Sequence, residues 1–129
     1  MYENDGEHVM AKILLIDDDP DIRTVMGMTL KREGYQVETA SRREEALEMI
    51  AAEKPSLILL DVLLSGSDGR ELCRELKADE ATRHIPIIMF SGHPVAAQQF
   101  ASYGADDFLA KPLNTQLLLQ KLSQRIAEK

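Results

Sequence analysis

The chain has 129 residues, of which 44% are hydrophobic, a length and composition that suit one globular domain and exclude a disordered chain. Its 22 acidic and 15 basic residues give a formal net charge of -7, which argues against nucleic acid as a direct ligand because phosphate backbones attract basic surfaces. No apolar run approaches the ~18 residues of a membrane-spanning helix, and the acidic start MYENDGEHVMAK is unlike a secretory signal.

Two features define the extent of the domain and its compartment. Residues 1–9 are interpreted as a disordered tail or an expression remnant, which leaves residues 10–129 as the folded domain. The only cysteine is Cys73, so an internal disulfide framework is excluded and a reducing compartment, the cytoplasm, is favoured. Cys73 lies on an apolar helix face and is expected to be a small core residue.

Short apolar runs alternate with helical patterns from residue 12 onwards. The run Lys12–Ile16 (KILLI) is nearly continuous, as in a strand that is buried on both faces. A helix is predicted over 20–33, with Gly34 as its C-cap, and a second strand over 35–39. The residues expected on the inner face of this helix recur at three-to-four spacing: Ile22, Val25, Met26, Thr29 and Leu30.

The middle of the chain continues the alternation. Ser41 is expected to cap the next helix and to form a capping box with Glu44. A third strand over 57–60 (LILL) runs into Asp61, and a further helix is predicted over 69–78.

The last part of the chain repeats the pattern twice. A strand over 87–90 (IIMF) precedes a weaker helix pattern over 94–103, and a short strand, Asp107–Ala110, precedes the last helix. The caps expected for the helix at 69 and for the last helix are Asp68, and Asn114 or Thr115. A βα unit repeated five times predicts an α/β fold, with a parallel sheet and helices on both faces.

Ligands of such sheets bind beyond the carboxyl ends of the strands, where this chain carries polar side chains. They are Asp17, Asp18 and Asp19 after the first strand, Asp61 after the third, Ser91 after the fourth and Lys111 after the fifth. If these strands are neighbours, one pocket holds oxygen ligands that suit a hard ion such as Mg²⁺. Such an ion, a lysine and a hydroxyl also stabilise a phosphoryl group in transfer to an aspartate nucleophile. We therefore interpret the pocket as a phosphoryl-accepting site centred on Asp61, which stands alone on its strand.

Four segments, ILLIDDDPDIR, LILLDVLLSGSDG, IPIIMFSG and GADDFLAKP, occur in this order over about residues 11–126. Together they resemble the receiver domain of two-component response regulators, of the chemotaxis-regulator kind. The resemblance implies a doubly wound, flavodoxin-like (βα)5 fold with a parallel five-stranded sheet in the strand order 2-1-3-4-5.

The same resemblance implies roles for the residues of the pocket. Asp61 looks like the phosphoacceptor, which takes a phosphoryl group from the phosphohistidine of a partner. Asp18 looks like a direct Mg²⁺ ligand and Asp17 like one that acts through water, while Asp61 itself and the backbone carbonyl of Leu63 complete the metal site. Lys111 looks like the cation that pairs with the phosphoryl oxygens.

Further positions match those that switch the family and set the lifetime of its acyl phosphate. Ser91 and Phe108 occupy the hydroxyl and aromatic switch positions, and Leu63 and His93 occupy the two positions that tune the lifetime. Ser65 stands where the family usually has a proline, which predicts a more flexible loop.

The resemblance also implies a cofactor, partners and an output. Mg²⁺, or Mn²⁺ in its place, is the expected cofactor, and a histidine kinase or phosphotransfer protein is the expected phosphodonor in a phosphorelay. The domain is expected to be a signalling switch and not an enzyme, although it assists its own aspartyl phosphorylation and dephosphorylation. A downstream protein or a second copy is expected to bind the face formed by the helix over 94–103, the strand Asp107–Ala110 and the last helix. Direct contact with nucleic acid or membrane is not expected.

Several of these motifs, and the chain as a whole, allow alternative interpretations. Asp19 is equally well explained as a helix cap, and the Lys111–Pro112 bond can be cis or trans. A phosphatase of the haloacid dehalogenase type needs acidic ligands after the lysine, and none occurs before Glu128. A pseudo-receiver that binds partners without phosphorylation is the remaining alternative. It should lack some pocket residues, whereas this chain has all of them.

Overall fold

The computed structural model describes residues 11–64, 67–93 and 95–127. The predictions of a tail over 1–9 and of a flexible loop at Ser65 concern residues outside these ranges. Within the ranges, none of the helices combines the length and the apolar character that crossing a lipid bilayer requires.

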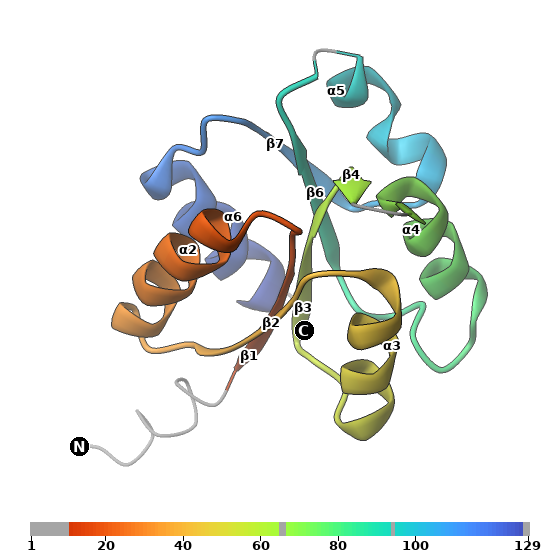
Figure 1. The fold of residues 1–129 in the computed structure, drawn as a ribbon, viewed down its shortest axis with the longest axis horizontal. Helices are drawn as coiled ribbons and strands as arrows, with labels where there is room; N and C mark the ends of the chain where they lie inside the picture. Colours follow the sequence, from red (N-terminus) through yellow and green to blue (C-terminus); the bar gives the residue numbers. More distant parts are fainter. Residues whose placement is uncertain (1–10, 65–66, 94, 128–129) are drawn as a thin grey trace.

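Parallel strands form one sheet in the order β2-β1-β3-β6-β7 (Figure 1). Their bounds are β1 Lys12–Ile16, β2 Gln36–Ala40, β3 Leu57–Asp61, β6 Ile87–Ser91 and β7 Asp107–Ala110. In chain order this is the expected 2-1-3-4-5, so the doubly wound topology is confirmed. The predicted strand over 35–39 lies one residue later, and the third and fourth strands include one more residue each, Asp61 and Ser91.

Helices cover both faces of this sheet. Their bounds are α2 Pro20–Arg32, α3 Arg43–Ala52, α4 Gly69–Ala78, α5 Ala96–Gln99 with the 3-10 helix η1 Phe100–Tyr103, and α6 Thr115–Ala127. Figure 1 shows α2 and α6 on one face and α3, α4 and α5 on the other. The crossovers thus give the layered arrangement that right-handed βα units predict.

The three central strands, β1, β3 and β6, are buried at every position. Successive side chains point to opposite faces of a strand: Leu14 and Leu60 pack under α3 and α4, while Leu15 and Leu59 pack under α2 and α6. Two separate cores therefore share one sheet, which is why these strands are apolar without alternation. Cys73 lies fully buried in the first of these cores, as expected.

Three of the expected helix caps are present. Asp19 accepts a hydrogen bond from the amide of Asp21 at 2.9 Å, Asp68 from that of Arg70 at 2.9 Å, and Asn114 from that of Leu117 at 3.0 Å. Each satisfies an amide that the first turn of a helix leaves without a partner.

The predicted capping box of Ser41 and Glu44 is not formed, so that prediction is wrong. Helix α3 begins one residue later than that motif requires, so Arg42 is its N-cap and makes no side-chain capping bond. Glu45 reaches back instead, and its Oε1 accepts from the amide of Ser41 at 2.7 Å and from its hydroxyl at 3.1 Å.

Two further differences concern helix faces and a loop. Val25 is 64% exposed, because the inner face of α2 is centred on Met26 and Leu30 and the preceding residue points about 100° away from it. The loop after β3 contains a short antiparallel pair that the sequence did not indicate, β4 Leu63–Leu64 and β5 Ser67–Asp68. The predicted helix over 94–103 is shorter and divided between α5 and η1, and its last turn tightens before Gly104, whose φ is 94°.

Candidate functional site

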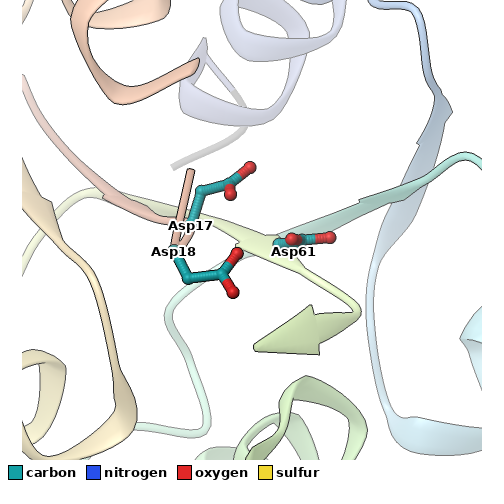
Figure 2. Close-up of side chains that lie close together, drawn as sticks. All are labelled: Asp17, Asp18 and Asp61. Carbon is teal, nitrogen blue, oxygen red and sulfur yellow. The ribbon is translucent and has the colours of Figure 1, made fainter. Parts of the chain in front are cut away.

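Three aspartates meet where β1 and β3 end (Figure 2). Asp17 and Asp18 follow β1, Asp61 is the last residue of β3, and one carboxylate oxygen from each lies within 4.8 Å of the other two. Asp17 and Asp61 are buried, with 0% and 5% exposure, whereas Asp18 is exposed. The cluster therefore has two buried carboxyl groups and one on the solvent side.

Lys111 brings a positive charge to the two buried carboxylates. Its Nζ lies 3.5 Å from Asp17 Oδ2 and 3.5 Å from Asp61 Oδ1. Its backbone amide donates to the carbonyl of Ser91 at 3.0 Å, and the bond to Pro112 is cis. Close ion pairs have N···O distances of about 2.7 to 2.9 Å, so the ammonium group is shared between two carboxylates and not tightly paired with either.

The electrostatics of the cluster favour protonation of its buried members. The pKa of Asp61 is raised to about 6, chiefly by burial and then by the charge of Asp17, against the opposing effects of Lys111 and the Leu63 amide. Burial also raises the pKa of Asp17, against the opposing effects of the Asp19 amide and Lys111. One cation thus leaves the pair with excess negative charge, which a divalent ion would relieve.

The donors fit such an ion. All three side chains are carboxylates, the oxygen ligands that hard cations such as Mg²⁺ prefer, and their spacing allows one ion to contact more than one of them.

The loop after β3 folds back tightly on Asp61. The amide of Leu63 donates to Asp61 Oδ1 at 3.4 Å, and the amide of Gly69 donates to the carbonyl of Val62 at 2.8 Å. A Cβ on Gly69 would lie 2.1 Å from the carbonyl oxygen of Asp61, so no other residue fits there without a backbone shift. The Asp-Gly pair at 68–69 is thus needed for the shape of this loop.

Ser91 ends β6, the neighbour of β3, and is 4% exposed. Its Oγ accepts a hydrogen bond from the amide of His93 at 3.0 Å. His93 is exposed, and its Nδ1 accepts from the amide of Val95 at 3.2 Å. Leu63, two residues after Asp61, is 60% exposed. His93 and Leu63 line the same cavity of about 230 Å³.

Phe108 lies on β7, where it is half-buried and packs against the core under α3 and α4. Its ring stacks on Phe100 with centroids 5.9 Å apart and 23° between the planes. The sequence did not indicate Phe100 as its partner. Nor did it indicate Arg23, whose Nη1 donates to the carbonyl of Asp17 at 2.7 Å. A basic residue one turn after a capping residue was the only available signal for Arg23.

A five-stranded doubly wound sheet with an acidic cluster, a lysine and a hydroxyl at its carboxyl ends defines a class of α/β phosphoryl-handling modules. The family model of the response regulator receiver domain matches residues 13–123. The chain belongs to this family.

Named relatives support this assignment. The chain is 40% identical over 112 residues to the phosphate regulon transcriptional regulatory protein PhoB of Pseudomonas aeruginosa, a match that covers 85% of this chain and 49% of that protein. It is 37% identical over 111 residues to the transcriptional regulatory protein AfsQ1 of Streptomyces coelicolor, which covers 84% and 48%. The chain thus spans about half the length of these regulators.

A solved structure of a receiver domain has the same fold as this chain. The receiver domain of NtrX from Brucella abortus superposes with a TM-score of 0.84 and 33% identity, over 91% of this chain and 99% of that one.

Proposed function

We propose that Asp61 accepts a phosphoryl group from the phosphohistidine of a histidine kinase or phosphotransfer protein. The observation that carries the proposal is the meeting of Asp17, Asp18 and Asp61 within 4.8 Å, with Lys111 Nζ 3.5 Å from both buried members. Membership of the receiver family supports it. The presence of every pocket residue disfavours the pseudo-receiver alternative.

In the proposed transfer, a carboxylate oxygen of Asp61 attacks phosphorus and forms an acyl phosphate. The bond between phosphorus and the imidazole nitrogen breaks, and its electron pair stays on the histidine. A carboxyl group with a pKa of about 6 is mostly ionised at neutral pH, so Asp61 is available as the nucleophile. Lys111 lies close enough to turn from the carboxylates to the incoming phosphoryl oxygens.

Mg²⁺, or Mn²⁺ in its place, is the cofactor that these donors suit. Asp18 and Asp61 would hold it directly, Asp17 through water and Leu63 through its carbonyl. When bound, the ion neutralises charge on the phosphoryl oxygens during transfer. The chain's own contribution is to fix Asp61 at the end of a buried strand and to hold Asp17 by the amide of Asp19, at 2.8 Å.

The switch that we propose follows from the position of Ser91. Its oxygen is occupied by the amide of His93, so its proton is the part that can be donated to a phosphoryl group on Asp61. A turn of Ser91 toward that group would alter the loop after β6, and Phe108 would change its packing against Phe100. The lifetime of the acyl phosphate would be set at Leu63 and His93. Leu63 is apolar and cannot orient an attacking water, whereas the exposed His93 would either orient one or shield the acyl phosphate from it.

We infer that the output is binding and not catalysis. A downstream protein or a second copy of the chain would bind the face of α5, β7 and α6 when Asp61 is phosphorylated. The net charge of -7 supports a protein partner in preference to nucleic acid. The free thiol of Cys73 is in keeping with the cytoplasm as the place of this exchange.

Phosphorylation by acetyl phosphate with Mg²⁺, followed by intact mass, tests the proposal. The wild-type chain should gain one phosphoryl group, Asp61→Asn should gain none, and the matched control Asp21→Asn, which removes an exposed carboxylate, should behave as wild type. A phosphoryl group on Asp61→Asn would refute the assignment. No gain in the wild type, with acetyl phosphate or with a phosphorylated kinase, would favour the pseudo-receiver alternative.

A further inference from the structure

The segment formed by α5 and η1 packs against α4 (Figure 1). Residues 96–99 are α-helical and 100–103 form a 3-10 turn. The only side chains of this segment that are buried are Ala96 and Tyr103. Tyr103 is thus a main anchor of the segment on the rest of the molecule.

A continuous series of contacts leads from the phosphoacceptor loop to this anchor. Gly69 bonds back to Val62 beside Asp61, and Asp68, which caps α4, forms a two-point ion pair with Arg70. In that pair Nε lies 2.8 Å from Oδ1 and Nη2 lies 2.7 Å from Oδ2. Such bidentate pairs fix both position and direction of a guanidinium group.

Arg70 then reaches Tyr103. Its guanidinium carbon lies 5.8 Å from the centroid of the Tyr103 ring, within the range of a cation–π contact. The pKa of Arg70 is raised, chiefly by its hydrogen bonds to Asp68. The Tyr103 hydroxyl donates to Gln99 Oε1 at 2.7 Å, which joins η1 to the last residue of α5.

A cavity lies between these two sides. Its volume is about 230 Å³, and its lining includes Val62 and Leu63 from the loop, Arg70, and Gln99 and Tyr103 from the segment. The cavity separates the loop after β3 from the α5–η1 segment, and Arg70 bridges the two through its contact with Tyr103. Such an arrangement leaves room for the segment to move relative to the loop.

We propose that Asp68, Arg70 and Tyr103 form a second connection between Asp61 and the α5–η1 surface, separate from Ser91 and Phe108. It rests on the proposed function, because it is phosphorylation of Asp61 that would move the loop. Movement of Asp68 would carry the guanidinium of Arg70, and with it Tyr103 and Gln99. Arg70 is a positioning residue in this scheme and takes no part in the transfer.

Arg74 provides a matched control. Its guanidinium carbon lies 4.9 Å from the centroid of the same ring, but among the described residues it makes no hydrogen bond to the loop. Replacing either arginine by methionine removes a cation from the ring and keeps a long side chain. Only Arg70→Met also removes the link to Asp68.

Amide chemical shifts recorded with Mg²⁺ and beryllofluoride, a phosphoryl analogue, test the scheme. In the wild type the amides of Leu63, Ser91, Gln99 and Tyr103 should all respond. In Arg70→Met the responses of Gln99 and Tyr103 should fall by a factor of about 2 or more, while Ser91 responds as before. Arg74→Met should respond as wild type. Arg70→Lys, which keeps the charge but not the two-point pair, should resemble Arg70→Met and serves if that variant does not fold.

The outcomes separate this inference from the proposed function. Undiminished responses at Gln99 and Tyr103 in the Arg70 variants, or an equal loss in Arg74→Met, would overturn the connection. So would a wild type in which Leu63 and Ser91 respond and Gln99 and Tyr103 do not. Silence at Leu63 and Ser91 in the wild type would instead count against phosphorylation at Asp61.

Discussion

The two ends of β1 hold buried charges in opposite ways. At its amino end Lys12 is 6% exposed, and its Nζ lies 2.9 Å from Glu53 Oε1 and 3.3 Å from Glu38 Oε1. At its carboxyl end two buried carboxylates share Lys111 at 3.5 Å each. One cation thus has two close anions, whereas two buried anions have one distant cation.

The pKa directions express this difference. Burial lowers the pKa of Lys12, but the hydrogen bonds to Glu53 and Glu38 and the charges of these two residues together outweigh burial, and the net effect is a raised pKa. Burial raises the pKa of Asp61 and the nearby cation does not restore it. The amino end is therefore organised for stability, and the carboxyl end keeps a charge imbalance that a ligand can relieve.

The largest expected effect tests how closely the carboxyl end is packed. Gly69→Ala places a Cβ 2.1 Å from the carbonyl oxygen of Asp61, so the loop must shift. We expect a loss of about 3 kcal/mol in the free energy of unfolding, measured by urea denaturation, together with slower phosphorylation. Gly27→Ala is the control, because a Cβ there meets nothing within 4 Å. Equal stability of the two variants would contradict the close approach.

Lys111→Met should have the next largest destabilising effect. It leaves Asp17 and Asp61 buried without a cation, and removing one partner of a buried pair costs about 2 kcal/mol or more at neutral pH. The cost should shrink toward pH 4, because Asp61, whose pKa is about 6 even with Lys111 present, is then protonated and the pair carries less charge. Urea denaturation in EDTA at pH 7 and pH 4 measures both values, and a loss of stability that is the same at the two pH values would exclude a charge effect.

Asp61→Asn should stabilise the protein at neutral pH. Because the folded-state pKa of Asp61 is raised from 3.8 to about 6, the folded protein holds this proton more tightly than the unfolded chain. Ionisation therefore costs stability as pH rises from about 4 through 6, by roughly 3 kcal/mol. The variant avoids this cost, so its advantage should be present at pH 7 and absent near pH 4. Thermal unfolding in EDTA checks the sign; a variant less stable than wild type at pH 7 would contradict it.

Lys12→Met should have the smallest effect, in spite of the shorter distances. The side chains of Glu38 and Glu53 are 46% and 74% exposed, so water can solvate both after the lysine is removed. We expect a change of less than about 1 kcal/mol by urea denaturation. A loss equal to that of Lys111→Met would show that the two ends do not differ as described.

The main features of the site were predictable because they depend on strand ends. An apolar run followed by a polar residue marks the carboxyl end of a buried strand, and the parallel topology then brings Asp17, Asp18, Asp61 and Lys111 to one edge. The strands β1, β3 and β6 are easy to recognise in the sequence as continuous apolar runs, because both of their faces are buried.

Features that depend on contacts between elements were not predictable. The exposure of Val25 depends on the rotation of α2 about its axis, which spacing fixes only to within about one residue. The pairing of β4 with β5 and the contact of Arg70 with Tyr103 join segments whose local sequences carry no signal of one another. The Ser41 capping box failed for a related reason, since a one-residue change in the helix start moved the hydrogen bond from Glu44 to Glu45.

The burial of β3 on both faces has a mechanical consequence. Leu57–Asp61 is buried at every position and hydrogen-bonded to strands on both sides, so displacing it would disturb two cores at once. Strain that arises at Asp61 cannot readily be relieved through this stiff support. We therefore expect a change at Asp61 to be relieved by movement of the more exposed parts of the molecule, such as α5 and η1, and not by movement of β3.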